Sequence, residues 1–469
     1  MSNPTSYTDA ALNYKNVHYN DFHSSDAAAL EGEEINEEEL HQSTILMTSF
    51  NVINSIVGSG IVGMPYALHK AGYGLGVLLL ITVSIATDQS LKFIIQCGQL
   101  SNTQTYQDMV KASLGHDVYI ILTIMQIMYP FIAMVSYNII IGDTLTKLAF
   151  RIVGEPALSS IIGDRRFIIF LTSVFIGFPL SSVKQVSRLS KISVLSTVIV
   201  IGIIVAMMLR IQLYSSVTVS FFANSNFANW KIPQAVAVMA FAFMCQHNSF
   251  ICFRSLRKRS MERWSIVVHL SVVFSFICSI IFGIVGYLTF QNDSQGDIFE
   301  NYCFMDDIIN VARFLFAIII MFTYPVECFV IREVIETLII NRGKVMTPFR
   351  HYLITAIIVI LSMFASMTTN CLSIILELNG ILTAAPMAFI LPPLCLMRLK
   401  NEPIFRSKNT MALFILIFGS VVIIFGSITL VLDLVQGIRC KHGENYNYCG
   451  ILFQELSISN ISMTHLSSR

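Results

Sequence analysis

Apolar residues gather in long runs from residue 43 onward, and short polar segments separate the runs. A helix that crosses a bilayer needs about 20 mostly apolar residues, and most of the runs approach or exceed that length. The pattern therefore predicts about eleven membrane-spanning helices. Their expected ranges are 43–70, 73–98, 117–149, 166–183, 190–213, 233–254, 265–290, 307–333, 350–369, 371–397 and 410–436.

Lysine and arginine are unevenly distributed among the loops that join these runs. Four basic loops fall on the side of the N-terminus, at 184–191, 254–263, 342–350 and 398–408. Because basic loops stay in the cytosol, the N-terminus is predicted to be cytosolic. The acidic loop NDSQGDIFENYCFMDD after the seventh run then lies outside, and the basic pair 165–166 opposes the trend.

The ends of the chain differ from its middle. Residues 1–42 are polar and finish in the run EGEEINEEEL. They are predicted to form a disordered, acidic cytosolic tail on which a cytosolic partner would dock. Residues 43–436 form the transmembrane domain, and an odd number of spans leaves 437–469 as an extracellular tail.

Two kinds of exterior modification fit this orientation. Asn292 and Asn460 each begin a glycosylation sequon, and both fall on the predicted exterior. In the C-terminal tail, Cys440 and Cys449 are available for a short disulfide. The other cysteines lie mostly within apolar runs, where they are expected to be small buried side chains.

Composition narrows the class of protein. Charged residues make up 13% of the chain, against about 25% in a typical soluble domain. A net charge of +1 gives no basic field, so no nucleic-acid partner is expected and membrane lipid surrounds the chain. We find no nucleophile–base pair and no metal-binding cluster, so neither a cofactor nor an enzyme activity is expected. The prediction is an all-α polytopic membrane protein.

The first run contains helix breakers, in the stretch NVINSIVGSGIVGMPYAL. Non-helical backbone at membrane depth is tolerated only where it is buried in protein or lines a cavity. Gly58, Ser59 and Gly60 allow the helix to unwind, which frees carbonyls for a small cation and a helix N-terminus for a carboxylate. Close helix packing through small residues is the alternative, but it does not explain Asn54 or Pro65.

The sixth run is interrupted at the matching place, five spans later. In FAFMCQHNSFICF, four polar residues from Gln246 to Ser249 separate two apolar halves. Transporters built from inverted repeats carry two interrupted helices at corresponding positions. The pair therefore predicts a five-plus-five inverted repeat in which helices 1 and 6 are interrupted, although a lone His247 would more often be a satisfied core residue.

The eighth run adds a third polar element, IIIMFTYPVECF. Thr323 precedes Pro325, whose missing N–H loosens the helix, so hydroxyl and carbonyl oxygens there suit a monovalent cation. Glu327 lies one turn further on and needs a partner or a water-filled cavity; an ion pair with Arg332 is the structural alternative. Three further intramembrane acids have no partner evident from the sequence: Asp88, Asp143 and Glu377.

Several of these stretches together resemble one family. They are FNVINSIVGSGIVGMPYAL, FAFMC at 241–245, GYLTF at 286–290, TYP at 323–325 and FILPP at 389–393. Over residues 43–436 the chain resembles the sodium-coupled neutral amino acid transporter family of the amino acid/auxin permease superfamily. The resemblance implies an eleven-helix version of the inverted-repeat fold, with sodium as the coupling ion and a neutral amino acid as the substrate.

The resemblance also implies site residues. A sodium site would use Asn54, Thr323 and the backbone carbonyls near Ile56 and Val57. The substrate's carboxylate and amino groups would meet the unwound segment Gly58, Ser59 and Gly60. The helix-six residues expected at the same substrate site are Cys245, Gln246, His247 and Asn248.

This chain departs from the family pattern at three positions. Gln246 follows Cys245 where many members have histidine, and Ile251 stands where a proline is expected in helix six. Val330 replaces a second proline that is common in helix eight. These changes are expected to alter the wall of the substrate pocket and hence side-chain selectivity.

The sequence thus predicts sodium-dependent symport of small neutral amino acids, glutamine-like or alanine-like, by alternating access. One alternative keeps the fold and replaces sodium by protons, with His247 or Glu327 titrating. A second alternative is a non-transporting amino-acid sensor that signals through residues 1–42. The expected location is the plasma membrane, with an endosomal or lysosomal membrane as the alternative.

Overall fold

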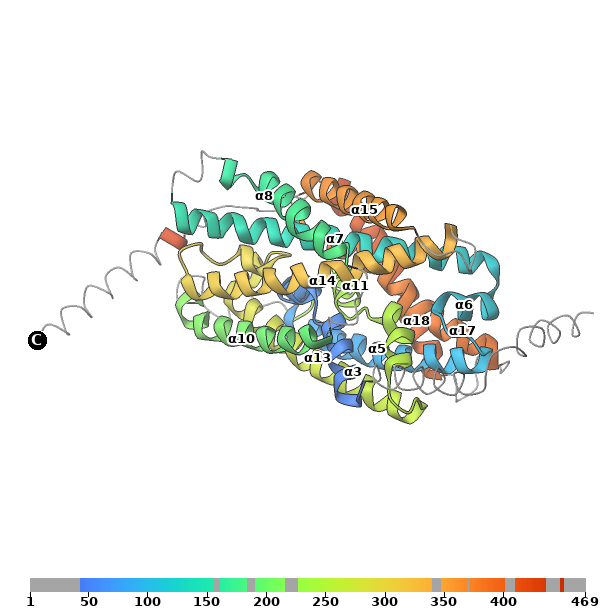
Figure 1. The fold of residues 1–469 in the computed structure, drawn as a ribbon. Helices are drawn as coiled ribbons and strands as arrows, with labels where there is room; N and C mark the ends of the chain where they lie inside the picture. The colour runs from blue at the N-terminus through green and yellow to red at the C-terminus, as the bar shows by residue number, and fades with distance from the viewer. Residues whose placement is uncertain are drawn as a thin grey trace, which may run out of the picture.

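The structure is a computed structural model that describes residues 43–154, 161–183, 190–215, 227–339, 347–369, 371–400, 410–435 and 448–450. Every regular element within these ranges is helical, apart from one isolated bridge between Ser43 and Leu256. The long helices run along one bundle (Figure 1). The predicted all-α membrane fold is confirmed, whereas the tail 1–42 and Asn460 lie outside the described residues.

Nine helical stretches in the described ranges are long and apolar enough to cross a membrane. They are α5 (Tyr73–Ser101), α7 (His116–Val153), α10 (Ser190–Ser215), α11 to α12 (Ile232–Ser255), α13 (Met261–Phe290), α14 (Asp307–Ile339), α15 (Pro348–Thr368), α16 to α17 (Leu372–Lys400) and α18 (Thr410–Val435). A bent pair within Ile45–Ala71 makes a tenth span. The short helix α6 (Tyr106–Leu114) precedes α7.

The fourth predicted span, 166–183, differs from the others. It consists of α8 (Arg165–Thr172), a π-helical turn η4 (Ser173–Gly177) and α9 (Phe178–Ser181), which follow one another without a break. The wide turn ends just before Pro179, which has no N–H to donate to the helical ladder. This stretch is too short to count as a span by length alone, yet it packs on α7 and α15 as an eleventh transmembrane element would.

The interruption predicted in span one is present. Helix α3 (Ile45–Ile56) begins at Thr44, whose hydroxyl accepts a bond from the N–H of Met47. It ends before a 3₁₀ turn η1 (Ser59–Gly63), and α4 (Met64–Ala71) follows, with Pro65 in its first turn. The two halves are bent by 46°. Proline is tolerated in that first turn, because its N–H would have no helical partner there.

The interruption predicted in span six is present as well. Helix α11 (Ile232–Ala242) ends ahead of a 3₁₀ turn η6 (Gln246–Asn248), and α12 (Ser249–Ser255) follows. Residues 243–245 between α11 and η6 are not helical. Spans one and six therefore share the same broken architecture.

Backbone hydrogen bonds join the ends of these two spans. The N–H of Ser43 donates to the carbonyl of Ser255, and the N–H of Arg257 donates to the carbonyl of Ser43. At the other end, the N–H of Asn229 donates to the carbonyl of Ala71. The start of span one thus lies beside the end of span six and vice versa, so the two broken helices run antiparallel, as an inverted repeat requires.

The outward faces of the bundle are apolar. On α18, Ile417, Val421, Ile424 and Ile428 are each about half exposed and follow a spacing of three or four residues. A stripe of that kind on a soluble protein would be an aggregation site, whereas in a bilayer it faces lipid tails. The exposed side chains therefore agree with a membrane-embedded bundle.

The intramembrane acids that had no partner in the sequence have partners in the fold. Asp88 pairs with Lys92 at 2.6 Å. Asp143 pairs with Arg165, so the arginine that opposed the charge trend serves a buried carboxylate. Glu377 accepts a hydrogen bond from the Tyr66 hydroxyl at 2.8 Å. In each case the partner offsets the free-energy cost of burying a carboxyl group within the membrane.

Two pairings are wrong: the alternative Glu327–Arg332 ion pair and the expected Cys440–Cys449 disulfide. Arg332 does not pair with Glu327; its guanidinium donates to the Ser181 carbonyl and the Thr355 hydroxyl instead. Arg332 also lies 3.7 Å from Glu336, one turn further along its own helix. That helical geometry turns Arg332 away from Glu327.

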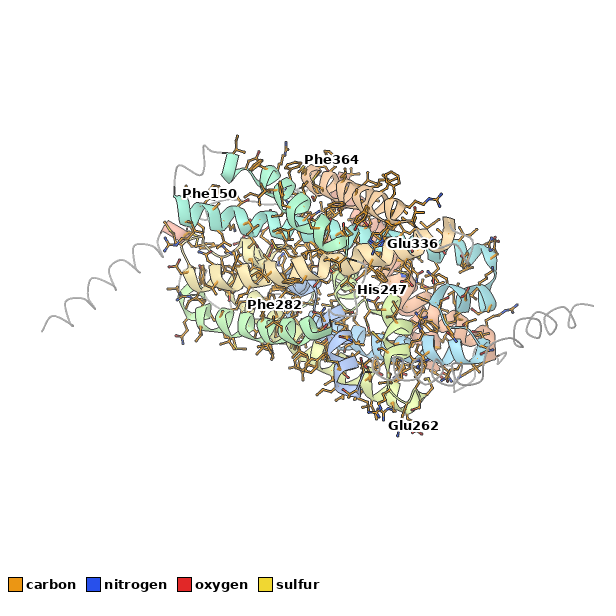
Figure 2. All side chains as sticks on the ribbon, in the orientation of Figure 1. Phe150, His247, Glu262, Phe282, Glu336 and Phe364 are labelled. Atoms are coloured by element: carbon orange, nitrogen blue, oxygen red, sulfur yellow. A yellow bond between two sulfur atoms is a disulfide. The ribbon has the colours of Figure 1, made fainter. Side chains whose placement is uncertain are left out.

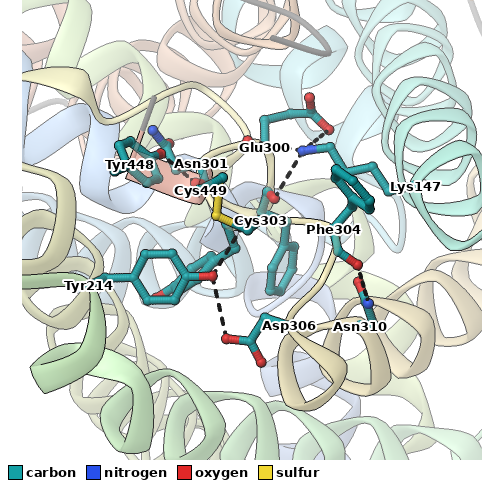
Figure 3. The surroundings of a disulfide bond; sticks show 12 residues. Lys147, Tyr214, Glu300, Asn301, Cys303, Phe304, Asp306, Asn310, Tyr448 and Cys449 are labelled. Atoms are coloured by element: carbon teal, nitrogen blue, oxygen red, sulfur yellow. Dashed lines mark hydrogen bonds and ion pairs between the residues drawn. A yellow bond between two sulfur atoms is a disulfide. The ribbon is translucent and has the colours of Figure 1, made fainter. Parts of the chain in front are cut away.

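The expected Cys440–Cys449 disulfide is the second error, because Cys449 is bonded to Cys303 across 146 residues of sequence. Figure 3 shows Cys303 within the segment that precedes α14 and Cys449 on the short C-terminal helix. Tyr448 donates a hydrogen bond to the Asn301 carbonyl at 2.6 Å, beside the disulfide. Nearness in sequence favoured Cys440, which lies outside the described residues, as the partner of Cys449. In the fold, however, Cys449 lies beside the loop that follows span seven.

Candidate functional site

The regular helical ladder of span one stops at the break. The Val57 N–H still bonds to the Ile53 carbonyl, and the next bond of the loop runs from the Ile61 N–H to the Gly58 carbonyl at 3.4 Å. Gly58 turns the chain with φ −89° and ψ −144°. Carbonyls at a helix C-terminus carry the negative end of the helix dipole, so this point attracts a cation.

Gly60 is explained by packing. A Cβ atom placed on Gly60 would lie 2.5 Å from the Cα atom of Ala242, at the end of α11. No side chain fits there, so glycine is what allows the two broken helices to touch. At Gly58 a Cβ would find its nearest neighbour, the Tyr137 hydroxyl, at 3.8 Å. The sequence offered two explanations for these glycines, close helix packing and an unwound segment. Gly60 is explained by close packing, whereas Gly58 lies beside a polar group at the break.

Helix α7 supplies polar groups to the break that sequence reasoning missed. The Ser59 hydroxyl lies 3.4 Å from the Ser136 hydroxyl. The neighbouring Tyr137 hydroxyl lies near both Ser59 and Glu327. The signal was present as the polar triplet Ser136-Tyr137-Asn138 in the middle of an apolar run. Span three thus connects the break in span one with the polar part of span eight.

The predicted residues of span six point in different directions. The Gln246 side chain accepts a bond from the Cys245 N–H at 3.0 Å and reaches the Ser90 hydroxyl of α5. Asn248 instead donates to the Ser55 hydroxyl of α3 at 3.5 Å. Gln246 and Cys245 are buried, and Gln246 packs against α5. Asn248 instead connects the break in span six to span one.

The His247 side chain points in a third direction, toward α7. Its ring lies against that of Tyr129, with the ring centres 5.0 Å apart. Neither ring nitrogen has a hydrogen-bond partner in the part of the chain that the structure describes. Figure 2 labels His247 near the middle of the bundle. The alternative of a satisfied core histidine therefore does not fit this residue.

The residues expected to bind sodium are not joined to one another by a hydrogen bond among the described residues. The Thr323 hydroxyl donates to the Ile319 carbonyl at 2.9 Å, so its oxygen lone pairs remain available as acceptors. The Asn54 side chain is half-buried on α3. The donor set is made of neutral oxygens, which fits a monovalent cation.

Glu327 is buried one turn beyond Thr323 on α14. Its Oε2 atom has no hydrogen-bond partner within the described ranges, and its neighbour is the Tyr137 hydroxyl. A carboxyl group therefore lies beside the break.

The segment 291–306 covers one end of the site. A Cβ on Gly296 would lie 2.5 Å from the backbone N of Ser373, which shows how closely the segment packs on α16. Lys147 of α7 lies 3.2 Å from the Glu300 carboxylate, and Arg313 of α14 donates to the carbonyls of Phe299 and Tyr302. Figure 3 shows Lys147 reaching Glu300 beside the disulfide. Buried charge pairs and a covalent bond hold this segment over η1.

Asp297 in this segment makes the stability of the fold depend on pH. Burial, with the Glu300 and Asp143 carboxylates, raises the pKa of Asp297 to about 7, while the Phe299 N–H and Lys147 oppose that rise. An unfolded aspartate has a pKa of about 3.9. The folded state therefore keeps a proton that the unfolded state loses, so the Asp297 contribution favours folding as pH falls from about 7 to about 4.

Asp297→Asn, which imitates the protonated acid, is expected to gain more stability over the wild type at pH 8 than at pH 5.5, because the wild type loses the Asp297 contribution as pH rises from about 4 to about 7. Melting temperatures in detergent at both pH values measure this difference. Asp307→Asn is the matched control, because Asp307 is exposed and pairs with Arg151 at the surface. A difference between Asp297→Asn and wild type that is the same at both pH values would contradict the prediction.

An all-α bundle with two antiparallel broken helices and polar groups at the breaks defines a membrane transporter. The family model described as "Transmembrane amino acid transporter protein" matches residues 41–432, and the chain belongs to that family.

Curated relatives agree. The chain is 42% identical over 423 residues to "Putative sodium-coupled neutral amino acid transporter 11" of Danio rerio, which covers 90% of this chain and 92% of the relative. The protein of the same name from Homo sapiens is 40% identical, covering 85% and 96%. "Vacuolar amino acid transporter 2" of Saccharomyces cerevisiae is 29% identical, covering 86% of each.

Among solved structures, the crystal structure of MhsT in complex with L-phenylalanine has a TM-score of 0.58 with this chain. The match covers 83% of this chain and 99% of MhsT, at 14% sequence identity. At that identity the likeness concerns the fold alone. It supports the inverted-repeat architecture that the two broken helices indicate.

Proposed function

We propose that the protein is a sodium-driven symporter of small neutral amino acids, with glutamine-like and alanine-like substrates, and that it works by alternating access. The observation that carries the proposal is the contact between the two broken helices, where Gly60 meets Ala242 at the end of α11. The relatives named as sodium-coupled neutral amino acid transporters support the choice of ion and substrate class.

The sodium site would lie between α3 and α14. The carbonyls of Ile56 and Val57, the Asn54 amide oxygen and the Thr323 hydroxyl are all neutral oxygen donors. Binding there would hold the end of α3 in place and so order the break for the substrate. The two ligands are then linked by a coupling free energy, which acts equally in both directions.

The substrate would bind next to the break. The N-terminal end of the second half of span one, with Gly58 and Ser59, offers backbone N–H groups to a carboxylate. The side chain would face the span-six residues Cys245 and Asn248. Alternating access would follow as the helices that carry the breaks tilt against their neighbours.

The test is uptake of glutamine and alanine into proteoliposomes, with and without a sodium gradient. Sodium-dependent uptake is expected in the wild type, and Asn54→Ala and Thr323→Ala are each expected to lower it more than about tenfold, since each removes a cation ligand. Thr429→Ala is the matched control, because Thr429 bonds within α18 far along the chain from either break. Uptake that is equal with and without sodium would overturn the proposed ion.

Proton coupling is the second candidate, and Glu327 is the observation that favours it. A buried carboxyl with one unbonded oxygen beside Tyr137 is chemically able to bind and release a proton next to the substrate. Tyr129 and Tyr137 of α7 are the titratable groups that face it. In the same liposomes, uptake driven by a pH gradient without sodium, and lost in Glu327→Gln, would select this candidate.

A further inference from the structure

A separate cavity of about 110 Å³ has His247 in its wall and none of the residues of the break in span one. Its walls come from α6 and α7 on one side and from α12 and α14 on the other. Arg254 lies at its rim, beside the basic loop 254–263. This is the cytosolic end of the bundle in the orientation that the Lys and Arg distribution predicts.

Two side chains face this cavity with polar atoms that no protein group satisfies. The Gln126 side chain is 4% exposed, and its Oε1 atom has no hydrogen-bond partner in the described part of the chain. Both ring nitrogens of His247 likewise have no hydrogen-bond partner among the described residues. An unsatisfied buried polar atom costs about 1–3 kcal/mol, so such atoms grouped around one cavity indicate a polar ligand.

The charges at the cavity are of both signs. Arg254 on α12 and Glu333 on α14 both line it, and Asp108 of α6 lies at the same rim. A zwitterion presents a carboxylate and an ammonium group together, so it matches this arrangement better than an anion or a cation alone. The volume is below the roughly 300 Å³ of drug-sized pockets, which limits the ligand to a small solute.

The cavity also contains two of the residues singled out in the sequence. Ile251 on α12 and Val330 on α14, which stand where the family pattern has prolines, both line it. They give it an apolar wall opposite the polar groups. A small side chain without charge fits that wall, whereas a charged one would lose its hydration there.

We propose that this cavity is a second binding site for a small neutral amino acid, on the cytosolic release path below the central site. The proposal rests on the proposed transport function. The Gln126 Oε1 atom accepts a hydrogen bond from the ammonium group, and His247 and Arg254 donate to the carboxylate. His247 stands between the two sites, because its ring also packs on Tyr129 beside Phe241 at the end of α11.

The experiment labels a cysteine placed in the cavity wall. Ile251 is 41% exposed, so Ile251→Cys is expected to react with a membrane-impermeant thiol reagent added to the cytosolic face of inside-out vesicles. Millimolar glutamine or alanine should slow that labelling, whereas lysine and glutamate should not. Phe349→Cys, at an exposed position on the same face of the membrane, is the matched control and should label equally with and without amino acid. The parent chain gives the background from its own cysteines.

Two variants test the assigned groups. Gln126→Leu and His247→Leu, each added to Ile251→Cys, are expected to raise the half-protecting concentration about tenfold, the loss of one good hydrogen bond. Each variant must keep the melting temperature of the parent chain. If one of the two variants does not fold, Thr123→Val takes its place, because it also removes a polar group from the cavity wall.

The same protection assay in Asn54→Ala separates the two proposals. Protection that persists there, while uptake is lost, supports the cytosolic site independently of the sodium site. Uptake that is intact in the parent beside labelling that no amino acid slows would overturn the cytosolic site and leave the symporter standing. Protection that is unchanged in both Gln126→Leu and His247→Leu would overturn the assigned ligand groups.

Discussion

Gly60→Ala is expected to abolish transport and to lower the melting temperature. The added Cβ would lie 2.5 Å from the Cα atom and 2.6 Å from the Cβ atom of Ala242. Backbone faces backbone at this point, so no side chain can rotate away and α11 must move. Overpacking in a filled core costs about 1–3 kcal/mol, and the cost is concentrated here on the two broken helices that form the site.

Two glycines provide matched controls. Gly58→Ala places its Cβ 3.8 Å from the nearest atom, and Gly202→Ala on α10 meets nothing within 4 Å. Both variants are expected to keep the wild-type melting temperature. Uptake of radiolabelled glutamine and thermal unfolding in detergent, measured on all three variants, make the comparison. Wild-type uptake by Gly60→Ala would show that the contact between spans one and six is not required.

This contrast also shows what the sequence could and could not predict at the site. The stretch GSGIVG indicated both an unwound segment and close packing, and nothing in the letters assigned one glycine to each. The assignment depends on which neighbour approaches each Cα atom. That neighbour, Ala242, lies in a span far along the chain, so only the fold identifies it.

The architecture was easier to predict from the sequence than the contacts between residues. Hydropathy and chain length predicted eleven spans, and ten of them are long and apolar enough to cross a membrane in the described residues, because a bilayer imposes a minimum length on each helix. Proline, glycine and polar residues in spans one and six predicted both interruptions, since such residues are costly in lipid without a reason. The fourth span was placed correctly, but its π-helical turn and short length have no signal in an apolar run.

Pairings between distant residues were the weakest part. An ion pair of Glu327 with Arg332 was the structural alternative because the two residues are close in sequence, but Arg332 donates to the Ser181 carbonyl instead. Tyr137 was overlooked because a tyrosine in an apolar run is usually core. The triplet Ser136-Tyr137-Asn138 that contains it is as polar as the interruption of span six. Charge, by contrast, carried information that was used only in part: an arginine on the wrong side of the membrane indicated a buried acid nearby.

That arginine leads to the second large effect. Asp143→Ala is expected to destabilise the protein by about 3–5 kcal/mol, because it removes the carboxylate from a buried guanidinium. The Arg165 side chain is 9% exposed and the Asp143 side chain 3%, so water replaces little of the lost interaction. The same helix α7 also carries an exposed ion pair, Arg151 with Asp307, whose side chains are 40% and 68% exposed. Arg151→Ala should cost no more than about 1 kcal/mol.

The double variant Asp143→Leu with Arg165→Met separates charge burial from packing. Replacing a buried pair by apolar groups of similar size is often neutral or stabilising, so the double variant is expected to unfold at a higher temperature than Asp143→Ala alone. Thermal unfolding in one detergent compares the three variants with the wild type. If the double variant were the least stable of all, the pair would be contributing specific hydrogen bonds beyond its charges. If Arg151→Ala matched Asp143→Ala, exposure would not be what distinguishes the two pairs, and the argument from burial would fail.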